Sequence, residues 1–102
     1  MLGAALIAWP AHAQTHAVGT ITMVRTGWNV DSFAVVLNVP VQNPARCPTA
    51  DGYITEASLP GYRTYLAAAL TAFASKSPVQ IVVHDKECFG NRPKLIGINL
   101  TR

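Results

Sequence analysis

The chain has 102 residues, of which 50% are hydrophobic and 13% are charged, and its formal net charge at pH 7 is +3. This length suits one domain. The charged fraction is about half of the roughly 25% that is usual in soluble domains, which excludes a long acidic or basic tail. A charge of +3 is far from the dense basic stripe of a nucleic-acid-binding protein. No apolar run approaches the roughly 20 residues that a membrane-spanning helix needs.

The first 13 residues are typical of an export signal. An apolar stretch over residues 2–9 is followed by Pro10, and Ala11-His12-Ala13 has the small-x-small pattern of a signal-peptidase site. The positively charged start of such a leader is missing, so we expect the leader to be truncated at its N-terminus. The alternative is an N-terminal strand or a buried helix. Cleavage after Ala13 predicts an exported protein, periplasmic or secreted, with a single mature domain over residues 14–102.

The two cysteines bear on the stability of this small domain. A domain of this size is marginally stable unless it is cross-linked. Two cysteines allow one pairing, and an exported chain favours a disulfide, so we predict Cys47–Cys88. Such a bond closes a loop of about 40 residues, worth about 3–4 kcal/mol in the chain-entropy model. The alternative is a reactive thiol, for which His84 is the nearest base to Cys88.

Alternating apolar and β-branched residues predict five strands, over residues 17–26, 32–39, 53–57, 79–84 and 95–101. Apolar side chains fall on one face of the second strand (Phe33, Val35, Leu37 and Val39) and of the fourth (Val79, Ile81 and Val83). Residues 40–52 and 86–94 contain proline, glycine and asparagine, which predicts two loops. Each loop holds one of the cysteines.

One helix is predicted between the third and fourth strands. Pro60 suits its first turn, and the helix should run to about Ser75. Its apolar stripe consists of Tyr62, Leu66, Ala69, Leu70 and Phe73. The resulting order, β-β-β-α-β-β, is that of the OB-fold, a mainly β, five-stranded and partly open barrel, and the helix would cover one end of it. An open α+β sandwich of the same elements is the alternative.

A series of short motifs carries a family resemblance. Gly19-Thr20-Ile21 lies in the first strand, and Leu59-Pro60-Gly61-Tyr62 leads into the Leu- and Ala-rich helix. Pro78-Val79-Gln80-Ile81, Cys88 and Leu95-Ile96-Gly97-Ile98 follow. Together they resemble small exported bacterial proteins related to the binding subunits of subtilase-type and pertussis-type toxins. The resemblance implies an OB-fold and a glycan-binding, ring-forming subunit, but no sugar-contacting residue carries over onto a position of this chain.

Two loops at the rim of an OB-fold would hold the ligand. An OB-fold binds ligands on the face of strands two and three, between the loop that joins strands one and two and the loop that joins strands four and five. An aromatic ring can stack on the apolar face of a sugar, while amide and cationic groups bind its hydroxyls or a carboxylate. The candidate ligand-binding residues in these loops are Trp28, Asn29, Phe89, Asn91, Arg92 and Lys94. The alternative is that Trp28 and Phe89 only cover the ends of the core.

The sequence does not predict an enzyme. We find no zinc spacing, phosphate loop, paired carboxylates or Ser-His-Asp arrangement in it, and His84 beside Asp85 has no nucleophile. After cleavage, the Gln14 amine and His16 would form a remote candidate Cu(II) or Ni(II) site. We therefore expect no cofactor, and an exported module that binds a glycan or a partner protein and can form homo-oligomers. The alternative is a structural or accessory periplasmic protein without a specific ligand.

Overall fold

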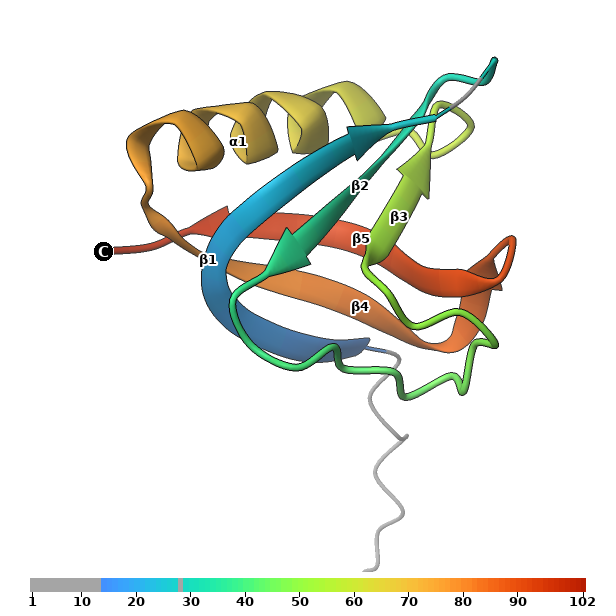
Figure 1. The fold of residues 1–102 in the computed structure, drawn as a ribbon. Helices are drawn as coiled ribbons and strands as arrows, with labels where there is room; N and C mark the ends of the chain where they lie inside the picture. The colour runs from blue at the N-terminus through green and yellow to red at the C-terminus, as the bar shows by residue number, and fades with distance from the viewer. Residues whose placement is uncertain (1–13, 28) are drawn as a thin grey trace, which may run out of the picture.

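The computed structural model describes residues 14–27 and 29–102, so the expected leader and Trp28 lie outside the described residues. The elements follow the predicted order β-β-β-α-β-β (Figure 1). They are β1 (Gln14–Thr26), β2 (Ser32–Leu37), β3 (Tyr53–Glu56), α1 (Tyr62–Ser75), β4 (Pro78–Phe89) and β5 (Arg92–Leu100). In the part of the chain that is described, no helix has the length and apolar character to cross a membrane.

The five strands form one sheet that closes in a ring, in the order β1-β2-β3-β5-β4. The long strand β1 pairs with two neighbouring strands. Its first half pairs with β4 from Gln14↔His84 to Thr20↔Pro78, and its second half pairs with β2 from Ile21↔Leu37 to Thr26↔Phe33. A short parallel contact between β3 and β5 completes the ring, whereas all the other neighbours are antiparallel. The closed ring therefore differs from the open α+β sandwich that was the alternative arrangement of the same elements.

The core fills the inside of this ring. The inward positions of β2 and β4 are those predicted from the alternation, because Phe33, Val35 and Leu37, and Val79, Ile81 and Val83, are all buried. Tyr53 lies among them and its hydroxyl accepts a hydrogen bond from the backbone N–H of Gln42 at 2.7 Å. Val39 was expected on the same face but is exposed, since β2 ends at Leu37.

The helix α1 packs against β1 and β5 and covers one end of the ring (Figure 1). Its buried residues are Tyr62, Ala69 and Ala72, and Leu66 packs partly against the core. The predicted stripe was wrong at its far end, where Leu70 and Phe73 are exposed. Beyond Tyr62 and Leu66, the buried side chains of the helix are alanines, which allow it to lie close to the strands. At this end the buried face is therefore turned away from the stripe that the larger residues suggested.

The predicted loop over residues 86–94 is a β-hairpin instead. Strand β4 continues to Phe89, β5 begins at Arg92, and only Gly90 and Asn91 lie between them. Gly90 has φ +57°, a conformation that glycine adopts at no steric cost and that a two-residue hairpin turn requires. Cys88 is thus a strand residue. The polar composition misled the prediction because only Pro93 is fully buried among residues 86–94, so this part of the hairpin has no apolar alternation.

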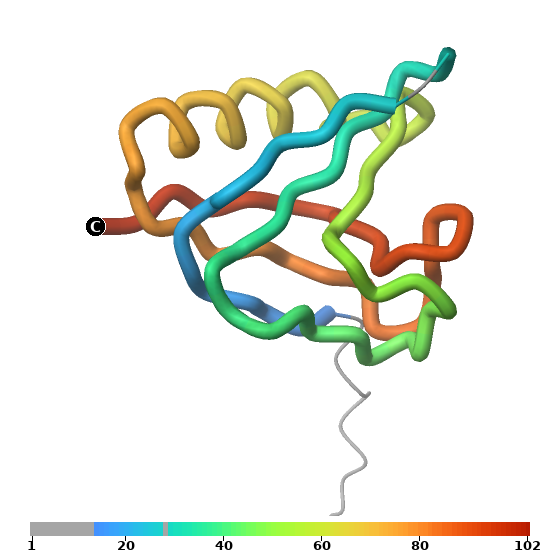
Figure 2. The backbone as a smooth tube through the Cα atoms, in the orientation of Figure 1, coloured from blue at the N-terminus to red at the C-terminus, as the bar shows by residue number. Residues whose placement is uncertain are grey.

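The long segment between β2 and β3 runs along the hairpin (Figure 2). The predicted disulfide is confirmed, since Cys47 in this segment is bonded to Cys88 in β4. The side chain of Asn43 holds the segment locally, because its amide exchanges two hydrogen bonds with the backbone of Cys47. The backbone N–H of Thr49 donates to the carbonyl of Asn91 at 2.8 Å. These contacts fix the loop against the hairpin just before Asp51.

Candidate functional site

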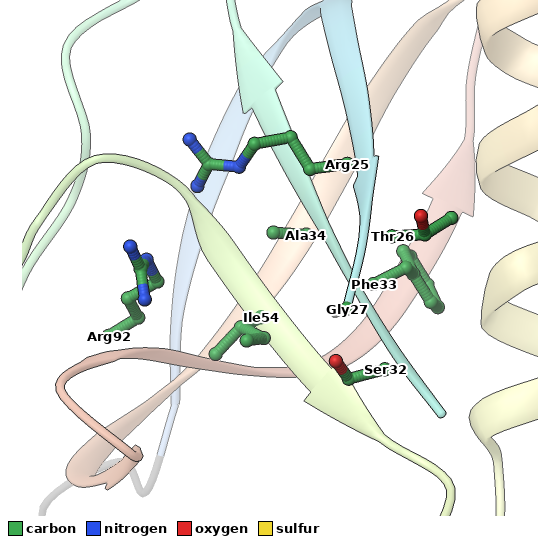
Figure 3. A pocket seen from close by; sticks show the side chains of 8 residues that line it. All are labelled: Arg25, Thr26, Gly27, Ser32, Phe33, Ala34, Ile54 and Arg92. Carbon is green, nitrogen blue, oxygen red and sulfur yellow. The ribbon is translucent and has the colours of Figure 1, made fainter. Parts of the chain in front are cut away.

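A groove of about 620 Å³ lies on the outer surface of the ring, where β1, β2, β3 and the start of β5 meet (Figure 3). Its size is in the range of small-molecule sites. The residues that line it are Arg25, Thr26, Gly27, Ser32, Phe33, Ala34, Ile54 and Arg92. The groove therefore combines an apolar floor with two guanidinium groups.

Strand register explains why these residues share one face. Arg25 in β1 lies opposite Ala34 in β2, and Ala34 lies opposite Ile54 in β3. Residues directly opposite each other on paired strands point to the same side of the sheet. Ile54 is in turn aligned with Lys94, and Arg92 is two residues earlier in β5. The small side chain of Ala34 leaves the floor hollow, and the two guanidinium groups lie close to each other because both bind Asp51 Oδ1.

The two arginines are held by one carboxylate. Asp51 accepts hydrogen bonds from Nε of Arg92 at 2.7 Å and from Nη2 of Arg92 at 3.2 Å, and a third from Nη2 of Arg25 at 3.2 Å. The hydrogen bond from Arg92, supported by that from Arg25, holds the pKa of Asp51 below its usual value. The same pairing raises the pKa of Arg92. Asp51 and Arg92 therefore both keep their charge near neutral pH.

A close backbone approach lets Arg25 reach Asp51. A Cβ atom on the buried Gly52 would lie 3.1 Å from Nη2 of Arg25 and 3.0 Å from the carbonyl oxygen of Val35. The guanidinium passes over this glycine, next to the loop that the disulfide and the Thr49–Asn91 hydrogen bond hold in place. The position of the arginine pair thus depends on a segment far from both arginines in sequence.

The structure places the predicted rim residues in different surroundings. Arg92 lines the groove. Phe89 and Lys94 contact each other, because the Lys94 ammonium lies 4.7 Å from the centre of the Phe89 ring and also donates to Glu87 Oε1 at 2.7 Å. That hydrogen bond lowers the pKa of Glu87.

The other predicted rim residues lie away from the lining. Asn91 is exposed in the hairpin turn, and its carbonyl oxygen accepts a hydrogen bond from the backbone N–H of Thr49. Asn29 is exposed and has φ 64°, a left-handed conformation in which asparagine is common. Trp28 lies outside the described residues.

Sequence reasoning missed Arg25, Asp51, Ala34 and Ile54. Strict alternation from the buried Ile21 would place Arg25 on the inner face, and the irregularity of β1 between Ile21 and Met23 turns it outward instead. No sequence pattern pointed to Asp51, because its partners are 26 and 41 residues away. The apolar floor was also hidden, since Ala34 and Ile54 belong to strands whose neighbouring residues are in the core.

Within the described residues, His84 makes hydrogen bonds to the backbone and His16 lies in a paired strand. Nδ1 of His84 accepts hydrogen bonds from the backbone N–H groups of Lys86 and Glu87, each at 3.1 Å, where the pairing of β4 and β5 is irregular. His16 lies in β1, and Gln14, Thr15 and His16 are paired in register with β4. This extended backbone differs from the curled chelate that the remote metal site would need. Among residues 14–27 and 29–102, no cluster of three or more His, Cys, Asp or Glu residues is placed to hold a metal.

A comparison of the chain with protein-family models, curated proteins and solved structures finds no match.

Proposed function

We propose that this chain is an exported OB-fold module that binds a glycan in the groove between Arg25 and Arg92, without converting it chemically. The groove itself is the observation that carries the proposal. It lies on the face where an OB-fold holds its ligand, between the two loops that rim that face. The resemblance to toxin binding subunits is part of the same proposal and is consistent with a glycan ligand.

The topology supports the OB-fold part of the proposal. The ring order β1-β2-β3-β5-β4, the parallel contact of β3 with β5, and a helix between β3 and β4 that covers one end are features of that fold. The strand β1, shared by both halves of the ring, is another. These features bear on architecture, and the groove bears on function.

The chemistry of the groove supports a sugar as ligand. Ala34 and Ile54 present apolar surface that suits the apolar face of a sugar ring. Each guanidinium has five N–H donors, and the hydrogen bonds to Asp51 use one donor of Arg25 and two of Arg92. The remaining donors can bind hydroxyl or acidic oxygens. Asp51 is committed to both arginines, which suits a site that binds and does not carry out acid–base chemistry.

A second function, a structural or accessory protein without a ligand, is favoured by one observation. The face of the Phe89 ring is occupied by Lys94, so the rim aromatic is already engaged within the molecule. If the same holds for the groove, its arginine pair only fastens the loop before β3 to the start of β5.

Binding to an immobilised glycan array separates the two functions. We expect the wild-type protein to bind a subset of glycans, and Arg25→Ala combined with Arg92→Ala to abolish that binding. Arg63→Ala is the matched control, because Arg63 is exposed on α1 and away from the groove lining. A wild-type protein that binds no glycan, or a double variant that binds as well as wild type, would contradict the proposal and favour the structural function.

A further inference from the structure

The charge of the groove is set by three residues. Arg25 and Arg92 contribute two positive charges, and Asp51 contributes one negative charge while bonded to both. Asp51 is outside the set of residues that line the groove, whereas both arginines belong to that set (Figure 3). The site therefore has an excess of one positive charge.

Neighbouring charges add no further positive charge to the groove lining. Lys94, the next cation along β5, forms an ion pair with Glu87 at 2.7 Å. Glu56 and Asp31 line a separate hollow of about 250 Å³ next to the loop between β1 and β2. The groove is thus bounded by one charge-balanced pair and by an acidic hollow, which disfavours a ligand with extended negative charge.

Asp51 also orients both arginines. The Arg92 guanidinium is bound by Asp51 through two parallel N–H groups, a geometry that fixes the plane of the group. Arg25 is held by the same carboxylate and by the close approach over Gly52. Because the guanidinium groups are already ordered, the protein loses less side-chain entropy when a ligand binds.

We propose that Asp51 is a specificity-determining residue, which weakens the preference of this positively charged groove for a ligand with two negative charges over a ligand with one. This inference rests on the proposed function only in using the same groove. In the wild-type site, Asp51 repels a dianion twice as strongly as it repels a monoanion, since the interaction energy is proportional to the ligand's charge. Removal of the Asp51 charge therefore favours dianions more than monoanions.

Two simple anions test the proposal without any assumption about sugars. Acetate carries one charge and sulfate carries two, and both are titrated into the ¹⁵N-labelled, disulfide-bonded protein while the Nε–H signals of Arg25 and Arg92 are followed by NMR. In Asp51→Asn we expect the ratio of sulfate affinity to acetate affinity to rise on the order of tenfold relative to wild type at low salt. Asp51→Glu keeps the charge and should keep the wild-type ratio.

Glu87→Gln is the matched control, because it removes a carboxylate of the same surface that is bonded to Lys94 and is not part of the groove. Because Lys94 does not line the groove, the ratio in Glu87→Gln should rise less than that in Asp51→Asn. Amide spectra of each variant check that it is folded. An unchanged ratio in Asp51→Asn, an equal rise in Glu87→Gln, or no response of either arginine signal to the anions would overturn the proposal.

The two experiments distinguish a failure of the role proposed for Asp51 from a failure of the proposed function. A silent glycan array together with the expected shift in anion preference would contradict the glycan-binding function and leave the role of Asp51 intact. Glycan binding that depends on Arg25 and Arg92, together with an unchanged anion preference in Asp51→Asn, would contradict the role of Asp51 alone.

Discussion

The ammonium group of Lys94 lies 4.7 Å from the centre of the Phe89 ring, on neighbouring strands of the β4–β5 hairpin. A cation over an aromatic face at this distance is favourable, by about 0.5–1 kcal/mol at exposed sites. The contact occupies one face of a ring that would otherwise be available to stack on a sugar. Phe89 is therefore placed to stabilise the hairpin, and this has a measurable consequence.

Phe89→Ala should lower the free energy of unfolding by about 1–2 kcal/mol, because the ring is only half-buried and a fully buried Phe is worth about 3–5 kcal/mol. Binding at the groove should be unchanged. Urea unfolding measures the first quantity and the glycan array the second, with Phe89→Leu as a control that keeps most of the apolar contact. Loss of binding at unchanged stability would show instead that Phe89 contacts the ligand.

The disulfide Cys47–Cys88 should be present in protein produced in an oxidising compartment, and mass spectrometry before and after reduction detects it. Replacing both cysteines by alanine should cost about 3–4 kcal/mol, because the bond closes a loop of about 40 residues in the unfolded chain. The loss is measured by urea unfolding. Two thiols that can be alkylated in the native, non-reduced protein would contradict the prediction and favour a reactive cysteine.

Acid should weaken the arginine pair in a way that depends on Asp51. The pKa of Asp51 in the folded protein is lowered from 3.8, so its contribution to stability is complete above that value and is lost as pH falls through the lower, folded-state pKa. The contribution is below about 1 kcal/mol, because the side chain is 44% exposed and solvent screens the pair.

Thermal unfolding of wild type and Asp51→Asn at pH 6, 4 and 3 tests this dependence. The difference in melting temperature between the two proteins should be largest at pH 6 and should shrink toward pH 3. A difference that stays constant over this range would mean that the carboxylate makes no charge-dependent contribution.

Gly52→Ala should destabilise the protein by about 1–2 kcal/mol and displace Arg25. Its Cβ would lie 3.0 Å from a backbone oxygen, that of Val35, which cannot move without disturbing β2. Gly97→Ala in β5 is the control, because its Cβ would meet the side chain of Val82 at an ordinary 3.4 Å. Unfolding measurements should separate the two variants, and the Arg25 Nε–H signal should move in Gly52→Ala alone. Equal stability of both variants would contradict the close approach.

The helix should respond to substitution by its observed face. Ala72 has no exposed surface, and Ala72→Leu should overpack the contact with the ring and cost about 1–3 kcal/mol. Phe73 is 44% exposed, and Phe73→Ser should change stability much less than the loss of a buried Phe would. Thermal unfolding of the two variants measures both effects. If Phe73→Ser lost more stability than Ala72→Leu, the buried face would instead be the one predicted from the large apolar residues.

The element order followed from local signals in the sequence. The alternation of Val79, Ile81 and Val83, for example, correctly identified the inner face of β4, since a strand with one buried face must alternate with a period of two. The disulfide also followed, because two cysteines have one pairing. The hairpin at residues 86–94 did not, because only Pro93 of this stretch is buried and its polar residues resemble those of a loop.

The pairing of distant strands decided the candidate site. Sequence alone identified Arg92 as a candidate, but its partners Arg25 and Asp51 meet it only because β1 and β5 belong to one closed ring and the disulfide holds the loop between β2 and β3 against the hairpin. Local propensity acts over a few residues, so it determines strands and turns. Which outward-facing side chains meet is determined by register and ring closure, which link residues 26 to 41 positions apart.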